Sequence, residues 1–271
     1  MQTAQQRREE IISRLLSRGH VDVKSLAADM AVSEATVRRD LRSLAGDNQA
    51  ELVYGGATLP RRGGFSIASR ALRNMEAKRT VGRLAGQLVG DSEMLYVDGG
   101  TTCFEMCYSL KQRRDLSVIV NSWRMAVELG DASGINLIQI GGHYRQERED
   151  CVGPLAAQAI DQLRGYLAFI SADGLSTDFG LWSNDIETAY LYQHVIRNAR
   201  DTVLLVDNSK FLAPSLFRIC DWDAVSRVVT NELPSEEWRG FFTEREIEVV
   251  CPQAQTSEGY QQSGAAQVLR V

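Results

Sequence analysis

The stretch SEATVRRDLRSL, residues 33–44, decides how the first part of the chain folds. Its apolar residues Val37, Leu41 and Leu44 occur at positions i, i+4 and i+7, the spacing of the buried stripe of an α-helix. Ser33 stands just before this pattern, where its hydroxyl can accept hydrogen bonds from the free amide groups of the first turn. The stretch therefore predicts an amphipathic helix that packs through these three apolar side chains.

The opposite face of this predicted helix is basic. At about 100° per residue, Arg39 and Arg42 point away from the apolar stripe, while Thr36 and Arg38 lie on its flanks. Three arginines can simply solvate a helix of any small bundle. The face alone therefore leaves two interpretations open, a solvated surface or a surface that binds a polyanion.

The neighbouring segments favour the second interpretation. Residues 5–18 predict a first helix and residues 21–30 a shorter second one. After the basic helix, AELVYGGATL predicts a short strand, a turn at Gly55 and Gly56, and a second extended segment. Two helices, a tight turn, a basic third helix and a hairpin form a winged helix-turn-helix, whose third helix enters the major groove of double-stranded DNA.

The charge is distributed unevenly along the 271 residues. The net charge is −5, but residues 1–73 hold a balance of +4 and the remainder a balance of −9, as a polyanion-binding module on an acidic body would show. No run approaches the roughly 18 apolar residues of a membrane span, and MQTAQQRREE lacks the apolar core of a signal peptide. With five scattered cysteines, an odd number, we expect a protein of the reducing cytoplasm that has no membrane partner.

The remaining sequence divides into a linker, a body and a tail. TLPRRGGFSIASR is rich in Pro, Gly and Arg, which predicts a linker at residues 58–75 after a DNA-binding domain at residues 1–57. The body spans residues 76–251. Residues 252–271 are rich in Gln, Ser, Gly and Ala, which predicts a disordered tail.

The body alternates short apolar runs with helical stretches. This alternation predicts a parallel sheet buried on both faces, with ligands bound outside the carboxyl ends of its strands. The predicted strands are MLYV, LSVIV, INLIQI, LAFIS, TVLLV, VSRVVT and IEVV.

Polar residues follow these strands. After MLYV comes Asp98-Gly99-Gly100-Thr101-Thr102, where curled backbone amides and threonine hydroxyls can hold an anion. The other strand ends predict a pocket for a small, phosphorylated, hydroxyl-rich ligand. They carry Asn121, Gly141, Gly142, Asp173, Gly174, Asn184, Glu187 and Lys210.

The two halves together resemble the DeoR family of bacterial transcriptional regulators. VSEATVRRDLRSL followed by YGGA resembles its N-terminal module, and DGGTT, VNS, GGHYR, SADGL, GLWSNDIE and VDNSKF follow the order of its sensor domain. The resemblance implies an α/β sensor domain with a fold similar to ribose-5-phosphate isomerase. It also implies a repressor of a carbohydrate-metabolism operon that responds to a sugar phosphate, without a cofactor and as a homo-oligomer.

The resemblance assigns roles to individual residues. The implied DNA contacts are Ser33, Thr36, Arg38, Arg39, Arg42, Gly55 and Gly56. Asp98, Gly100, Thr101 and Thr102 are implied to take the phosphate, and Asn121, Asp173, Asn184, Glu187 and Lys210 to line the rest of the site. The sequence departs from the family pattern at Glu51 and Tyr54 in a less basic wing, at Leu191, and at Trp182.

Two other functions are weighed against a regulator. A sugar-phosphate isomerase would use Asp173, Glu187 and Lys210 as base and enediolate stabiliser, but it leaves the DNA-reading module unexplained. An architectural DNA protein has no use for a phosphate loop. His20, His143 and His194 lie far apart and predict no metal site, with a surface or pocket-rim position for each. We therefore expect a regulator and not an enzyme.

Overall fold

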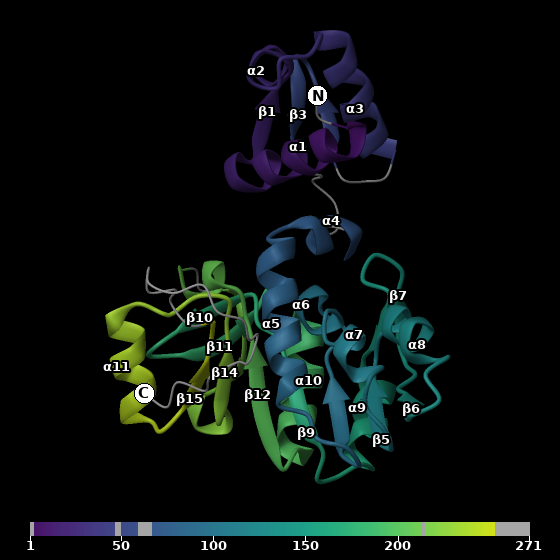
Figure 1. The fold of residues 1–271 in the computed structure, drawn as a ribbon, viewed down its shortest axis with the longest axis vertical. Coiled ribbons are helices and arrows are strands. Elements are labelled where there is room, and N and C mark those ends of the chain that lie inside the picture. The colour runs from purple at the N-terminus through teal and green to yellow at the C-terminus, as the bar shows by residue number, and fades with distance from the viewer. Residues whose placement is uncertain (1–2, 47–49, 59–66, 213–214, 253–271) are drawn as a thin grey trace, which may run out of the picture. The chain divides into compact units, whose positions relative to one another are not determined.

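The computed structural model describes residues 3–46, 50–58, 67–212 and 215–252. The chain forms two compact units, residues 1–75 and residues 76–271 (Figure 1), and each is described by itself. In the described parts, no helix is both long and apolar enough to cross a membrane.

The smaller unit is a winged helix-turn-helix, as predicted. Its three-stranded antiparallel sheet has the order β1-β3-β2. A core of apolar side chains from the three main helices and the sheet includes Leu15, Leu26, Val37 and Leu41. The elements are α1 (Ala4–Arg18), β1 (His20–Asp22), α2 (Val23–Asp29), α3 (Glu34–Gly46), β2 (Glu51–Val53), β3 (Gly56–Thr58) and α4 (Ile67–Leu72).

Side-chain caps fix where these helices begin. The Asp22 carboxylate accepts hydrogen bonds from the amides of Lys24 and Ser25 at 2.9 and 3.0 Å, which starts α2 directly after β1. The Thr36 amide donates to Ser33 Oγ at 3.2 Å, so Ser33 caps α3 as predicted. Each of the two helices α2 and α3 therefore begins at a capping side chain.

The predicted linker contains a helix. Within residues 58–75, Ile67–Leu72 form α4, and Leu72 packs against the core of the smaller unit. An apolar side chain that reaches an existing core can order a short segment that composition marks as a linker. Residues 59–66 lie outside the described residues, as do residues 253–271 of the predicted tail.

The larger unit is built on a seven-stranded parallel sheet, and all the predicted strands are confirmed. Its order is β15-β14-β12-β9-β4-β5-β6. The strands are β4 (Met94–Val97), β5 (Leu116–Val120), β6 (Ile135–Gln139), β9 (Leu167–Ile170), β12 (Asp201–Leu205), β14 (Arg227–Val229) and β15 (Glu248–Val250).

Apolar side chains leave both faces of this sheet. Tyr96 and Ile170 belong to one buried cluster, and their chain neighbours Leu95 and Phe169 belong to the other. The first cluster packs under α9 (Pro154–Asp161), α10 (Ile186–Asn198) and α11 (Glu236–Glu244). The second packs under α5 (Met75–Gln87), α6 (Thr101–Phe104), α7 (Cys107–Leu110) and α8 (Trp123–Leu129).

The strand order reverses direction next to β4. The chain runs from β4 through β5 to β6 on one side and then returns to place β9 on the other side of β4. Such a switch point leaves a crevice at the carboxyl ends of the two central strands. The Asp98 amide donates to the Phe169 carbonyl of β9 at 3.0 Å. Asp98 therefore lies at the switch point, directly after β4.

Two small antiparallel sheets were not predicted. β7 (His143–Arg145) pairs with β8 (Asp150–Val152), and β11 (Gly180–Ser183) lies between β10 (Gly174–Ser176) and β13 (Phe217–Cys220). These strands have three or four residues each and carry polar side chains, so they lack the apolar runs that mark the parallel strands. They stand just where the candidate site residues lie.

Candidate functional site

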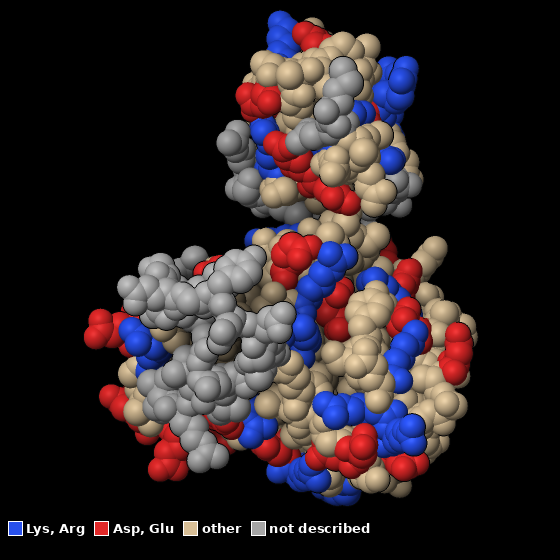
Figure 2. Space-filling view, in the orientation of Figure 1, with Lys and Arg blue, Asp and Glu red and all other residues tan. Residues whose placement is uncertain are grey.

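The outer face of α3 is exposed and basic. Arg38, Arg39 and Arg42 are exposed while Val37 and Leu41 are buried, which is the predicted orientation. Arg38 pairs with Glu34 at 3.3 Å, a surface pair that contributes little to stability. Arg39 and Arg42 make no ion pair with any described residue. Figure 2 shows Lys and Arg side chains projecting from the side of this unit where α3 lies.

Asp40 lies within the same motif but points inward. The Arg7 guanidinium donates to its carboxylate from Nε at 2.8 Å and from Nη2 at 3.4 Å. Arg8 donates to Ser43 Oγ at 2.8 Å. These contacts fasten α3 to α1 and hold the basic face in place. Sequence reasoning missed this role, although Asp40 follows Val37 by three residues and so falls on the buried side of the helix.

The two wing glycines shape the hairpin. Gly55 has φ +82°, a conformation that other residues rarely adopt. A side chain at Gly56 would overlap the carbonyl oxygen of Val21, because β3 pairs closely with β1. Their predicted DNA contacts remain a prediction, and their observed contacts are within the smaller unit.

In the larger unit, Asp98 occupies the switch point. Its side chain is 3% exposed, and Oδ2 has no hydrogen-bond partner among the described residues. Burial raises the pKa of Asp98 to about 6, and hydrogen bonding from Tyr192 and the Gly100 amide offsets part of this rise. A buried carboxylate oxygen without a donor is costly, so this atom is suited to accept a hydrogen bond from a ligand.

The turn after Asp98 offers free donors. The amides of Gly99, Thr101 and Thr102 donate no hydrogen bond to any described residue. Gly100 stands at the start of α6 without a side-chain cap. The backbone at this turn can therefore donate to an anion, which is the chemistry that the sequence predicted.

Asn121 lies next to this turn, but its side chain is already used. A side chain at Gly99 would come within 3.4 Å of Asn121 Oδ1 and 3.6 Å of Asp150 Cβ, so these segments are neighbours. Tyr96 donates to Asn121 Oδ1 at 3.2 Å, and Asn121 Nδ2 donates to the Cys151 carbonyl at 3.0 Å. Asn121 thus fastens β8 to the end of β5.

A second group of predicted residues surrounds the start of α10. Asp173 Oδ2 accepts hydrogen bonds from the Asn184 amide at 2.8 Å and from Ser183 Oγ at 3.3 Å. Asn184 is exposed. Asp185 caps α10 by accepting from the Thr188 amide at 2.7 Å. These bonds hold both Asn184, which precedes α10, and the first turn of α10, which carries Glu187.

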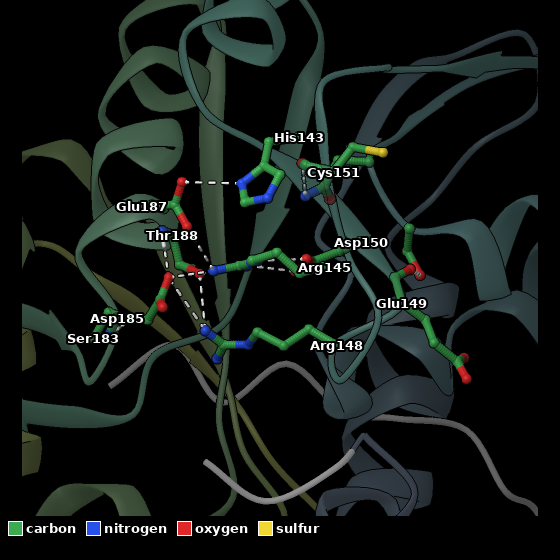
Figure 3. Close-up of polar contacts among 12 residues, drawn as sticks. His143, Arg145, Arg148, Glu149, Asp150, Cys151, Ser183, Asp185, Glu187 and Thr188 are labelled. Atoms are coloured by element: carbon green, nitrogen blue, oxygen red, sulfur yellow. Dashed lines mark hydrogen bonds and ion pairs between the residues drawn. The ribbon is translucent and has the colours of Figure 1, made fainter. Parts of the chain in front are cut away.

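Arg145 joins the two groups (Figure 3). Its guanidinium donates to both carboxylate oxygens of Asp150 at 2.7 Å, to Asp185 Oδ1 at 2.6 Å and to Thr188 Oγ1 at 3.0 Å. The Arg145 side chain is 11% exposed. Burial by itself would raise the pKa of Asp185, but hydrogen bonds from Thr188 and Arg145 outweigh it and lower this pKa to about 2. We call Arg145 with Asp150, Asp185 and Thr188 the arginine clamp; sequence reasoning did not find it.

Glu187 stands at the open side of the arginine clamp. Its Oε1 lies 3.6 Å from His143 Nδ1 and its Oε2 lies 3.9 Å from Arg145 Nη1, and the side chain is 40% exposed. Arg148 adds a second guanidinium, 3.2 Å from both Asp185 Oδ1 and Thr188 Oγ1. Glu187 is therefore bound less closely than Asp150 and Asp185.

The remaining predicted ligands lie around these two groups. Gly141 is exposed with open space beside it, while Gly142 packs against Ala156 in α9. Gly174 is buried in β10, opposite Trp182. Lys210 is half-buried in the short helix η1 (Asn208–Leu212), and its amide donates to the Asp207 carbonyl at 3.0 Å.

Three further side chains that the sequence singled out have the following positions. Leu191 is fully buried in the core, so it does not line a ligand site. Trp182 is half-buried, with its ring edge against Phe179 at 6.4 Å between centroids. His194 is 12% exposed and bonds Asp161 at 3.0 Å between α9 and α10. Across the described residues, no group of His, Cys, Asp and Glu is arranged to hold a metal ion.

Two family models match the chain. Residues 7–62 match the DeoR-like helix-turn-helix domain, and residues 73–232 match the DeoR C terminal sensor domain. The second match covers more than half of the chain.

Curated relatives match over most of their length. The putative aga operon transcriptional repressor of Escherichia coli O157:H7 is 29% identical, with 87% of this chain and 89% of the relative covered. The transcriptional regulator YgbI of E. coli K12 is 31% identical over 84% and 89%. The glycerol-3-phosphate regulon repressor of the same strain is 26% identical over 90% and 97%. Among solved structures, ribose 5-phosphate isomerase A of Methanocaldococcus jannaschii has a TM-score of 0.39 and 21% identity over 51% of this chain and 55% of that one.

Proposed function

The chain belongs to the DeoR family of transcriptional regulators, and we propose that it represses a carbohydrate-metabolism operon under the control of a phosphorylated sugar or related metabolite. Its relatives are named as regulators and repressors, so it is not an enzyme. One observation carries the proposal: a single chain combines an exposed arginine face on α3 with a turn of free amide donors at a sheet switch point.

The DNA contacts of this proposal come from α3. Arg39 reads a base edge in the major groove, and Arg38 and Arg42 hold phosphates. Ser33 and Thr36 stand in the first turn, where their hydroxyls bond each other at 2.9 Å. The contacts between Arg7 and Asp40 support this role because they fix the orientation of the helix.

The effector contacts come from the larger unit. The phosphate accepts hydrogen bonds from the amides of Gly99, Thr101 and Thr102 and from the two threonine hydroxyls, while the sugar hydroxyls reach Asp98 Oδ2 and Glu187. The free Oδ2 of Asp98 and the open position of Glu187 support this assignment. Asn121 and Asp173 support neighbouring loops in this proposal, since their polar atoms bond within the chain.

The protein acts as a homo-oligomer, a dimer or a tetramer, in the cytoplasm. One recognition helix reads few base pairs, and paired half-sites multiply the affinity for an operator.

The test begins with the DNA. Random duplexes are selected with the full-length protein, and the selected operator is then titrated in gel shifts with a panel of sugar phosphates and their unphosphorylated parents. A thermal-shift screen of the same panel identifies the ligand, because a compound that binds the folded state raises its melting temperature. If no duplex is enriched, or if no phosphorylated compound shifts both melting and operator affinity, the proposal fails.

Coupling between the two sites is tested at Lys210. We expect Lys210→Ala to bind the selected operator normally but to respond poorly to the effector, since a ligand changes DNA affinity only through its differential affinity for two arrangements. Lys24→Ala, on the surface of the smaller unit, is the control substitution. A Lys210→Ala protein that melts early, yet whose folded fraction responds fully, would assign Lys210 to stability alone.

A further inference from the structure

The tip of the wing carries an exposed aromatic side chain. Tyr54 and Gly55 form the two-residue turn between β2 and β3, and Tyr54 is 107% exposed. The two preceding side chains, Leu52 and Val53, are 47% and 37% exposed. The hairpin therefore presents an apolar strip that ends in a fully accessible ring.

This tip is held in a fixed position. The Val23 amide donates to the Gly55 carbonyl at 2.9 Å, which ties the turn to the start of α2. Gly56 is buried against the Val21 carbonyl, and β2 and β3 both pack against α3. Tyr54 is thus attached to the same rigid unit as the arginine face, so that docking it costs little conformational entropy.

The wing lacks the charge that would bind phosphate. Residues 50–58, AELVYGGAT, contain no Lys or Arg, and Glu51 is the one charged residue among them. The positive charge of the proposed DNA surface comes from Arg38, Arg39 and Arg42 on α3. A contact between the wing and DNA must therefore rest on shape, apolar surface and the Tyr54 hydroxyl.

We propose that Tyr54 docks into the minor groove beside the major groove that α3 enters, with its ring against deoxyribose and base edges. This inference rests on the proposed DNA-binding function and adds a contact that is independent of phosphate charge. Tyrosine suits the position because its ring buries a large apolar area and its hydroxyl can still bond at the groove edge. Because β2 and β3 pack against α3, which carries the exposed arginines, duplex DNA is the occupant that we assign to this surface.

The experiment measures salt dependence as well as affinity. The full-length protein and its variants are titrated against the selected operator over a range of salt concentrations. Each lost phosphate contact makes the slope of log K against log salt shallower by about 0.9, whereas loss of an apolar contact leaves the slope unchanged. We expect Tyr54→Ala to bind about tenfold more weakly at every salt concentration, with the wild-type slope.

Three further variants sharpen the result. Tyr54→Phe should keep most of the affinity, and Tyr54→Arg should give a slope steeper by about 0.9 because it creates a phosphate contact. Tyr108→Ala, which removes an exposed tyrosine of the larger unit, should bind like wild type. Tyr54→Ala should melt like wild type, since its side chain has no burial to lose.

The outcomes separate this inference from the proposed function. Wild-type operator affinity in Tyr54→Ala overturns the inference, and so does a shallower slope, which would indicate a phosphate contact. A change of oligomeric state in Tyr54→Ala would overturn it too, by assigning the tip to a second copy of the chain. If Arg39→Ala binds as wild type, the proposed function fails; if Arg39→Ala loses affinity and Tyr54→Ala does not, the Tyr54 inference alone fails.

Discussion

Arginines serve opposite purposes in the two units. Arg39 and Arg42 stand on one exposed face of α3 and make no ion pair with any described residue, whereas Arg145 is 11% exposed and bonds two carboxylates. Positive charge held for a polyanion is left unpaired, and its removal should change binding without changing stability. Positive charge that holds several segments of a site together is paired with carboxylates of the same unit, and its removal should change stability first.

The largest expected effect is at the arginine clamp. Arg145→Met leaves Asp150, 8% exposed, without its guanidinium, and should lower the free energy of unfolding of the larger unit by about 3–5 kcal/mol. Chemical denaturation of the full-length protein measures this loss. The double variant Arg145→Met/Asp150→Asn removes the stranded charge and should recover much of it.

Arg148→Met is the matched control for the clamp. Arg148 reaches Asp185 and Thr188 through one nitrogen at 3.2 Å and does not contact Asp150. Its loss should cost far less than the loss of Arg145. Equal losses of unfolding free energy in the two variants would contradict this prediction. They would mean that the bonds of Arg145 to Asp150 add nothing, and that Arg145 does not join the two groups of site residues.

The second effect has the opposite sign and depends on pH. Because burial raises the pKa of Asp98 to about 6, the folded protein keeps a proton that the unfolded chain releases above pH 4. Stability is therefore unaffected below about pH 4, falls as the pH rises to about 6, and stays reduced above it. Asp98→Asn should remove this cost and stabilise the larger unit by about 2–3 kcal/mol at pH 7.

Melting at several pH values tests this prediction. The advantage of Asp98→Asn should be largest at pH 7 and absent at pH 4, while its effector response should be lost. A variant that is less stable at pH 7 would mean that the Asp98 carboxylate holds the switch point together. In the expected outcome, a free carboxylate oxygen at the switch point lowers stability, whereas an exposed, unpaired arginine on α3 does not.

The third effect concerns the exposed face of α3. Arg39→Ala should weaken operator binding by about 1–3 kcal/mol and relax specificity at one base pair. Arg38→Ala and Arg42→Ala should weaken binding to all sequences alike and make the salt slope shallower by about 0.9 each. Melting temperatures should stay at the wild-type value, and a drop in any of them would show that the arginine face also supports the fold.

The same contrast between the two units explains which features could be predicted from the sequence. The arginine face could be predicted because a helix repeats every 3.6 residues, so Val37 and Leu41 fix the direction of Arg39. The parallel strands could be predicted because strands buried on both faces are short apolar runs. Each of these signals lies within a few residues of chain.

The arginine clamp has no such local signal. Arg145 bonds Asp150 five residues away, but Asp185 and Thr188 follow it by 40 and 43 residues. No periodicity joins residues at those separations, and the short strands β7 and β8 lack an apolar run. The strand order that brings Asp98 beside Asn121 is likewise a tertiary fact. Asp40 is an intermediate case, since its inward position follows from the helix period but its partner Arg7 does not.

The smallest expected effect tests whether the turn after Asp98 holds phosphate. Thr101→Val keeps the shape of the side chain but removes its hydroxyl, which is half-buried at the start of α6. One hydrogen bond to a charged group contributes about 1.5 kcal/mol, so a phosphorylated effector should bind about tenfold more weakly. Its unphosphorylated parent should bind as before, and so should the operator. Calorimetry of both ligands separates the cases: equal losses would place the sugar at this turn, and no loss would leave the anion to the backbone amides alone.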